Sequence, residues 1–237
     1  MSKIVITQPM FMPWIGLFQQ FKLATTIVYL DDVQLPLGRS FTNRVQVQTK
    51  DGVKWLTVPI KRSGKQLIKD VKIDNSSDWR KSHLGTLKQS YGKAPYAELA
   101  LNLVDDIYSN GSESLSDFCI FGIERITEFL GLKYDSKLSS SYRFNSFKSE
   151  KLLDIISAEG ARNYLTGHGA AKYLDHHLFE ASDVKVEYID YKLPNYNQHF
   201  EPFTPFVSII DLIANVGFDT INHLEANTIN WREFISE

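Results

Sequence analysis

The sequence contains a single cysteine, no apolar run long enough to cross a bilayer and no excess of basic residues. One cysteine excludes an intrachain disulfide and a cysteine-based zinc site. Cys119 lies beside Phe118 and Ile120, and apolar neighbours are typical of a small buried thiol. Crossing a bilayer takes about 20 consecutive apolar residues, so we expect no membrane span. The 26 Lys and Arg against 28 Asp and Glu give a net charge of −2, which argues against nucleic acid or an anionic membrane as a partner.

Residues 1–6 also lack the charged n-region, the long apolar region and the small-residue cleavage site of a signal peptide. Together with the lone thiol, this predicts a soluble cytoplasmic protein. The length of 237 residues allows one large domain or two small ones. Since no linker, repeat or low-complexity tract interrupts the chain, we expect a single α/β domain over 1–237. The sequence leaves open whether that domain forms a homo-oligomer.

Hydrophobic patterns near the N-terminus predict a strand–helix–strand unit. Residues 3–7 and 26–30 are β-branched or apolar runs typical of buried strands. Between them, apolar residues recur at the helical period from Trp14 to Phe21, and Pro13 stands where proline is best tolerated, at the start of a helix. Such a unit implies parallel strands joined by a right-handed crossover.

The middle of the chain interrupts this α/β pattern. Asp51-Gly52 lies between two alternating runs and predicts a β-hairpin over about 44–60. From about 78 to 131 the apolar residues follow the helical period, which predicts an α-helical insertion. The expected fold is therefore α/β, with a mostly parallel central sheet flanked by helices, a small hairpin and a helical insertion.

Ligands of α/β folds bind beyond the carboxyl ends of parallel strands, where helix N-termini face the crevice. The first such segment is 8–16, which includes Gln8 and Pro13. Its helix start offers free N–H groups, Gly16 allows close approach to the backbone, and Trp14 offers a stacking face. The alternative is that these residues only turn and pack the chain.

The second segment begins with Asp31 and Asp32 at the end of the next predicted strand. Paired carboxylates there can hold Mg²⁺ or act as a general base. The arginines that follow suit phosphate, because their planar fork binds its oxygens bidentately. The alternative is that one acid caps a turn and forms an ion pair with Arg44. The candidate binding residues of this segment are Arg39, Ser40, Asn43 and Arg44.

The third segment is a Thr-Gly-x-Gly turn over 166–169, which follows a predicted strand and precedes a predicted helix. Such a turn can form an anion-binding nest of backbone amides, although its spacing is neither that of a P-loop nor that of a dinucleotide fingerprint. His168 can act as acid or base or contact phosphate; the alternative is an incidental loop histidine. The candidate binding residues here are Thr166, Gly167, Gly169, Lys172 and Tyr173.

All three segments lie at strand ends or helix starts of one predicted sheet, so we expect them to meet in one cleft. His176 and His177 are adjacent and would point in different directions on a helix, unlike the i, i+4 pairs typical of metal ligands. No metal-ligand motif is present in the sequence, and we expect no metal site.

Six blocks in order along the chain resemble those of the WbqC-like family of bacterial proteins. They are QPMFMPWIG at 8–16, LDDVQ at 30–34, RSFTNR at 39–44, WLTVP at 55–59, YLTGHGAAKYL at 164–174 and FTPFVSIIDL at 203–212. The first block departs from the family pattern Gln-Pro-x-Tyr, because Phe11 replaces the tyrosine and removes its hydroxyl. The resemblance implies a role in O-antigen and lipopolysaccharide biosynthesis, acting on a sugar nucleotide or its amino sugar.

A weaker similarity links the opening strand, turn, helix and acids to the HxGH nucleotidylyltransferases. Here Trp14-Ile15-Gly16-Leu17 stands where the phosphate-contacting histidines would be, and both histidines are absent. Fold analogy of this kind carries little functional weight.

The family resemblance implies a transferase that modifies an amino sugar on a nucleotide carrier by acyl or aminoacyl transfer. His168, Asp31 or Asp32 would be the base, and the arginines, Lys172 and the glycine-flanked amides would bind phosphates. One alternative is an ATP- and Mg-dependent ligase or nucleotidylyltransferase, and another is a non-catalytic sugar-nucleotide-binding or assembly protein. The expected partner is a sugar nucleotide or another small phosphorylated ligand. The co-substrate stays open between an acyl donor and ATP.

Overall fold

The computed structural model describes residues 2–36, 38, 40–193 and 195–236. Its central element is a six-stranded sheet in the order β10-β9-β8-β1-β2-β7, parallel throughout except for β10, which runs antiparallel to β9. The mostly parallel α/β sheet predicted from the sequence is thereby confirmed. The strands are β1 (Lys3–Thr7), β2 (Thr26–Tyr29), β7 (Asp135–Leu138), β8 (Asn163–Thr166), β9 (Lys185–Tyr191) and β10 (Ala226–Asn230).

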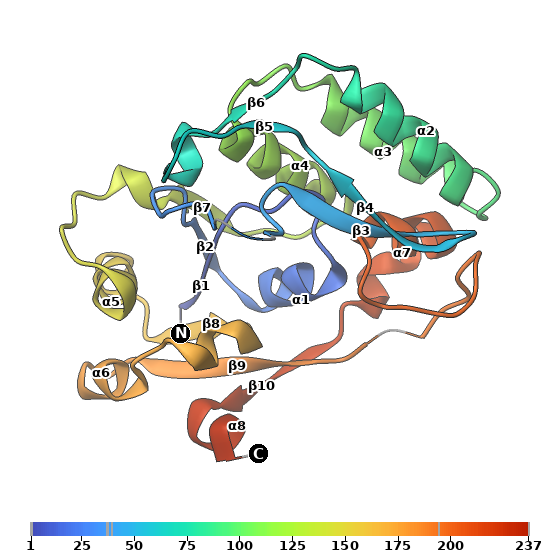
Figure 1. Ribbon diagram of the computed structural model, residues 1–237. Helices are drawn as coiled ribbons and strands as arrows, with labels where there is room; N and C mark the ends of the chain where they lie inside the picture. Colours follow the sequence, from blue (N-terminus) through green and yellow to red (C-terminus); the bar gives the residue numbers. More distant parts are fainter. Residues whose placement is uncertain (1, 37, 39, 194, 237) are drawn as a thin grey trace.

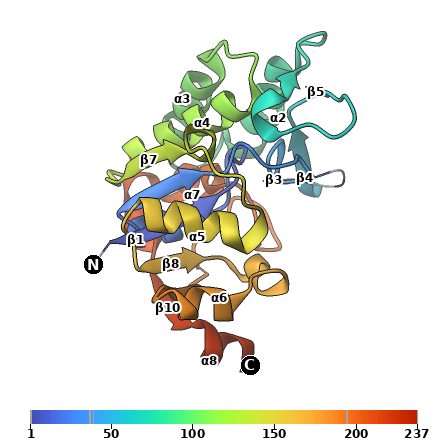
Figure 2. The ribbon, with the colours of Figure 1, turned by 90° about the vertical axis from the view of Figure 1, so that its left-hand side faces the viewer.

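Helices cover both faces of this sheet, and a hydrophobic core lies under each layer. Figure 1 shows α5 and α6 on one side of β1 and β2 and α1 on the other, and Figure 2 brings α5 to the front of the strands. The first core comprises residues of α1 (Ile15–Leu23), α2 (Trp79–Tyr91), α3 (Ala97–Ser109), α4 (Leu115–Phe129) and α7 (Ile209–Val216). The second comprises residues of α5 (Lys148–Ala158) and α6 (His176–Ala181), and residues of α8 (Trp231–Ser236) pack against it.

The two cores follow from the period of two along each strand. In β1, Val5 belongs to the core beneath α1, whereas Ile4 and Ile6 belong to the core beneath α5. Phe18 and Phe21 of α1 are both almost fully buried against the first face. Because β1 is covered on both faces, it is a continuous apolar run, as strands of parallel sheets usually are.

The predicted hairpin is present as β3 (Arg44–Thr49) and β4 (Gly52–Thr57), paired antiparallel. Gly52 in its turn has φ +95°, a left-handed conformation that glycine adopts without steric cost. A second, two-residue ladder joins β5 (Ile60–Lys61) to β6 (Lys72–Ile73), with the short 3₁₀ helix η1 (Ile68–Asp70) between them. Helices α2, α3 and α4 then form the predicted helical insertion before β7.

Strand order creates a switch point between β1 and β8. The chain moves from β1 through α1 to β2 and β7, then returns through α5 to β8 on the other side of β1. Right-handed crossovers in opposite directions place α1 and α5 on opposite faces, which agrees with the two cores. The segments that follow β1 and β8 therefore diverge, and a crevice opens at their carboxyl ends.

Candidate functional site

A cavity of about 810 Å³ lies at this switch point. Its lining includes Gln8 after β1, Leu30 and Val33 after β2, and Gly167 after β8. The first and third segments singled out from the sequence thus meet in one cleft, whereas the second contributes only Val33 and none of its described candidate residues. Its volume falls within the range of about 300–1,000 Å³ typical of small-molecule sites. We call it the main cleft.

The glycine-flanked turn after β8 forms one wall of the main cleft. A Cβ atom at Gly167 would lie 2.8 Å from the hydroxyl oxygen of Tyr191, so only glycine fits there without movement. The Tyr191 hydroxyl accepts a hydrogen bond from Gln20 Nε2 at 3.0 Å, and burial raises the pKa of this phenol. The chain continues into the 3₁₀ helix η3 (His168–Lys172).

His168 lies in this wall with one ring nitrogen already engaged. Its Nε2 is 2.7 Å from the carbonyl oxygen of Ile189. Because a carbonyl only accepts hydrogen bonds, Nε2 must carry the proton, and in the neutral ring Nδ1 is then the acceptor. The ring packs between Tyr191 and Phe234, with centroid distances of 4.9 and 4.7 Å. The side chain therefore has a fixed tautomer and a supported orientation, as a general base requires.

Asp31 is buried and fully engaged with the turn that follows β7. Its carboxylate accepts hydrogen bonds from the Ser139 hydroxyl at 3.0 Å, the Ser140 amide at 2.9 Å and the Ser140 hydroxyl at 2.7 Å. These contacts hold the 3₁₀ helix η2 (Ser139–Ser141) against the end of β2. They match the turn-capping half of the alternative for this acid; the ion pair with Arg44 is not formed between the described side chains, because Arg44 stacks on Trp55 and Asp32 pairs with Lys151.

Asp32 forms an ion pair with Lys151 of α5 at 2.6 Å and shares the single hydroxyl proton of Ser139 with Asp31. Burial alone would raise the pKa of Asp32, but the hydrogen bonds from Lys151 and Ser139 and the charge of Lys151 outweigh it and hold the pKa below its ordinary value. Lys151 lines the main cleft, whereas Asp32 does not. The acid thus positions a cation at the edge of the cleft.

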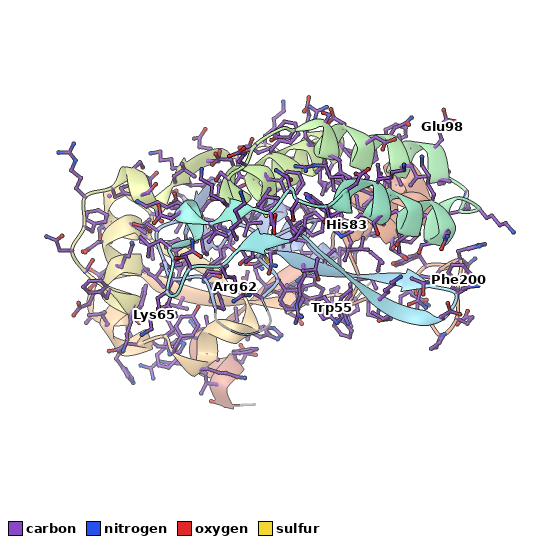
Figure 3. The ribbon with its side chains drawn as sticks, turned by 45° about the horizontal axis from the view of Figure 1, so that its top comes forward. Trp55, Arg62, Lys65, His83, Glu98 and Phe200 are labelled. Carbon is purple, nitrogen blue, oxygen red and sulfur yellow. The ribbon has the colours of Figure 1, made fainter. Side chains whose placement is uncertain are left out.

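Arg44 lies outside the main cleft, on the hairpin. Its guanidinium carbon is 4.1 Å from the centroid of the Trp55 ring, a cation–π contact; Trp55 is labelled at the hairpin in Figure 3. Nearby, Asn43 donates to the Val58 carbonyl at 3.0 Å, and Ser40 donates to the Thr42 hydroxyl at 2.9 Å. These contacts brace the hairpin and its entry. Arg39 lies outside the described residues.

The start of α5 supplies cleft cations that sequence reasoning missed. Lys148 and Lys151 both line the main cleft. Lys148 has φ +54°, a left-handed conformation rare for residues other than glycine. Such strain costs on the order of 1–3 kcal/mol and clusters at functional sites. Positive partial charge at a helix N-terminus adds to the Lys148 ammonium group, while the charge of Lys151 is already paired with Asp32, so Lys148 and the helix start make this end of the cleft favour an anion.

Trp14 forms an aromatic part of the cleft lining, the aromatic wall. Its ring packs on Tyr191 and Phe206 at centroid distances of 5.1 and 5.9 Å. A Cβ atom on Gly16 would lie only 2.2 Å from an indole carbon. The Trp14 ring thus packs directly on the Cα of Gly16, which agrees with the alternative that this glycine has a packing role.

Comparison with known proteins identifies the family. The family model of the WbqC-like protein family matches residues 8–223. The chain belongs to the WbqC-like family. The uncharacterized protein Rv1507c of Mycobacterium tuberculosis (strain ATCC 25618 / H37Rv) is 30% identical over 228 residues, which cover 94% of this chain and 98% of that protein. No solved structure matches the chain.

The six sequence blocks of this WbqC-like protein divide by position. Among the candidates from the sequence, those that line the main cleft are Gln8, Trp14, Thr166, Gly167, His168, Gly169 and Tyr173. The described candidates outside its lining are Pro13, Gly16, Asp31, Asp32, Ser40, Asn43, Arg44 and Lys172. The lysines of α5 belong to none of the blocks. One signal in the sequence could have identified these lysines. The helix predicted over 149–158 precedes a predicted parallel strand, and the N-terminus of such a helix faces the crevice.

Two further findings bear on ligands. No three His, Cys, Asp or Glu side chains among the described residues lie close enough together to hold a metal ion. In the same part of the chain, no helix is both long and apolar enough to cross a membrane.

Proposed function

We propose that this WbqC-like protein is a transferase of surface-polysaccharide biosynthesis that binds a nucleotide-linked amino sugar in the main cleft and acylates its amine. The observation that carries the proposal is that one cleft is lined both by Lys148 at the start of α5, beside the Asp32-paired Lys151, and by His168 held in a single tautomer. A diphosphate suits the lysine at the start of α5, and an amine nucleophile suits His168. The family resemblance supplies the pathway.

The cationic end would hold the diphosphate. Lys148 and the start of α5 offer an ammonium group and a positive helix end. Elsewhere in the lining, Gly167 and Gly169 allow a ligand to approach the backbone without side-chain obstruction. Trp14 and Tyr173 provide aromatic faces for a base or sugar ring.

His168 would act as the general base of acyl transfer. The amine nitrogen attacks the acyl carbonyl carbon, a C–N bond forms, and the bond from that carbon to the donor's leaving atom breaks. The proton lost by the amine passes to His168 Nδ1 and then to the leaving group. The hydrogen bond to Ile189 fixes the proton on Nε2, which leaves Nδ1 as the nitrogen that takes part in this exchange.

The contacts of the acids weaken the case for an ATP- and Mg-dependent ligase. Asp31 already accepts three hydrogen bonds from serines, and Asp32 is paired with Lys151. Neither carboxylate lines the main cleft. A metal at this pair would have to compete with these partners.

The test is calorimetric titration with dTDP- and UDP-linked 4-amino sugars. The Lys148→Ala variant should bind about 10–100-fold more weakly than wild type, since a hydrogen bond to a charged group contributes about 1.5–3 kcal/mol. Lys185→Ala is the matched control, because Lys185 is exposed at the amino end of β9, away from the cleft. Equal weakening in both variants, or no binding by wild type, would refute the proposal.

A further inference from the structure

A second cavity of about 290 Å³ adjoins the main cleft. The two cavities share Met10, Trp14 and Phe206 as lining residues. We call this second cavity the annexe. Its position places it behind the aromatic wall, on the side of the cleft that faces the hairpin.

The annexe is apolar. Apart from the three shared residues, it is lined by Phe11, Pro13, Phe41, Val45 and Gln46, so none of its described lining side chains is ionisable. A charged group would lose its hydration there without gaining a partner, at a cost of several kcal/mol. An alkyl chain would instead gain about 25 cal/mol for each Å² it removes from water.

Backbone hydrogen bonds hold the walls of the annexe together. The Phe11 amide donates to the Phe41 carbonyl at 3.1 Å, and the Ser208 amide donates to the Gln46 carbonyl at 2.8 Å. The segment after β1, the hairpin and the segment before α7 are thereby tied to one another. The annexe is a preformed space, which lowers the ordering cost of a ligand that fills it.

Two large side chains at the annexe remain exposed. Phe41 is 57% and Phe206 56% exposed, although both rings line the annexe and Phe206 also lines the main cleft. Exposed aromatic groups gathered at an apolar hollow are typical of a ligand site. Because the two cavities share lining residues, we expect a ligand of the annexe to extend into it from the main cleft.

We propose that the annexe binds the alkyl chain of an acyl thioester, the donor in the reaction proposed above. The inference rests on that proposed function and adds its donor class. The sugar amine forms a C–N bond to the thioester carbonyl carbon, the C–S bond breaks, and the amine proton reaches the leaving thiolate through His168. The uncharged lining of the annexe favours a plain acyl group over an aminoacyl group.

The volume of the annexe limits the chain. At about 30 Å³ for each water-sized group, a cavity of 290 Å³ holds at most about ten non-hydrogen atoms. We therefore expect affinity to rise with chain length up to roughly eight carbons and then to level off. Each added methylene should tighten binding about fourfold within that range.

The experiment is calorimetric titration with S-acyl-N-acetylcysteamine thioesters from acetyl to decanoyl. In Phe206→Ala the octanoyl thioester should bind about tenfold more weakly, because one wall of the annexe is lost, and the loss should be smaller for the acetyl thioester, whose short chain does not fill the annexe. Val45→Phe, which fills the annexe from β3, should abolish the gain with chain length. Phe218→Ala is the control, since Phe218 is 71% exposed and lines neither cavity.

The outcomes separate the two proposals. Affinity independent of chain length in wild type, or equally changed in Phe206→Ala and Phe218→Ala, overturns the annexe inference even if dTDP-linked amino sugars bind. A chain-length dependence that Phe206→Ala removes supports the inference. If that dependence is found and no sugar nucleotide binds, the annexe remains an alkyl site and the proposed transferase function fails. The binding data of Val45→Phe are interpreted only if this variant unfolds cooperatively. If it does not, the test rests on Phe206→Ala, whose side chain is exposed.

Discussion

Replacing Gly16 with alanine should strain the wall of the main cleft. The new Cβ would lie 2.2 Å from one carbon of the Trp14 indole and 2.6 Å from two others, so the ring must move by more than 1 Å to restore ordinary contact distances of about 3.5–4 Å. Overpacking of this kind costs about 1–3 kcal/mol. Alanine in a helix regains about 1 kcal/mol relative to glycine. The net expectation is a loss of about 0–2 kcal/mol in the free energy of unfolding.

Gly85→Ala separates the two contributions. Gly85 lies in α2, and a Cβ there would meet nothing within 4 Å. This variant should gain about 1 kcal/mol from helix propensity alone. Urea unfolding, with equal slopes in both variants, gives the comparison. The two variants should differ by about 1–3 kcal/mol, and Gly16→Ala should also weaken ligand binding through Trp14. Equal stabilities would refute the reasoning.

Three further predictions concern named acids and the histidine. Asp32→Asn should cost roughly 1–3 kcal/mol at pH 7. Because the pKa of Asp32 is held low, the loss should shrink as pH falls below about 4; a cost independent of pH would contradict this. Asp211→Ala removes the acceptor of the Tyr196 hydroxyl and one of the three acceptors of Gln198 Nε2 and should cost about 1–3 kcal/mol by chemical denaturation; Asp211→Asn should cost far less. His168→Ala should lower turnover of thioester and amino sugar about 10²–10⁴-fold and leave sugar-nucleotide affinity within a few-fold. Turnover near wild type would remove His168 from the mechanism.

The central strands could be predicted because burial on both faces makes them continuous apolar runs. β1 and β2 are such runs, and the alternation around Asp51-Gly52 marked the hairpin. The two edge strands had no such pattern. β7 is exposed along its whole length, and β10 (Ala226–Asn230) contains two asparagines and a threonine. An edge strand buries little apolar surface, so its pairing is set by the sheet beside it.

The parts of the site that directly follow predicted strands could be predicted from the sequence. The segment 8–16, which contains Trp14, and the glycine-flanked turn 166–169 both line the main cleft, because the parallel strands before them end at the same edge of the sheet. Arg44 was harder to place, since its side chain depends on the hairpin register. Arg44 pairs with Thr57, so Trp55 is its diagonal neighbour on the same face. The guanidinium therefore covers the indole, and its predicted role in phosphate binding remains a prediction.

Lys148 escaped prediction because its importance depends on the crossover. Only the return of the chain through α5 to β8 brings the start of that helix to the cleft. Asp31 shows the reverse case. Its acid pair suggested chemistry, but the partners that engage it, Ser139 and Ser140, come from more than 100 residues later in the chain.

The most direct test of the central claim is a crystal structure with a dTDP-linked amino sugar bound. The account predicts density in the main cleft, with the diphosphate within hydrogen-bond distance of Lys148 Nζ and the amine on the side of His168. A nucleotide bound outside the residues that line the main cleft would contradict the account.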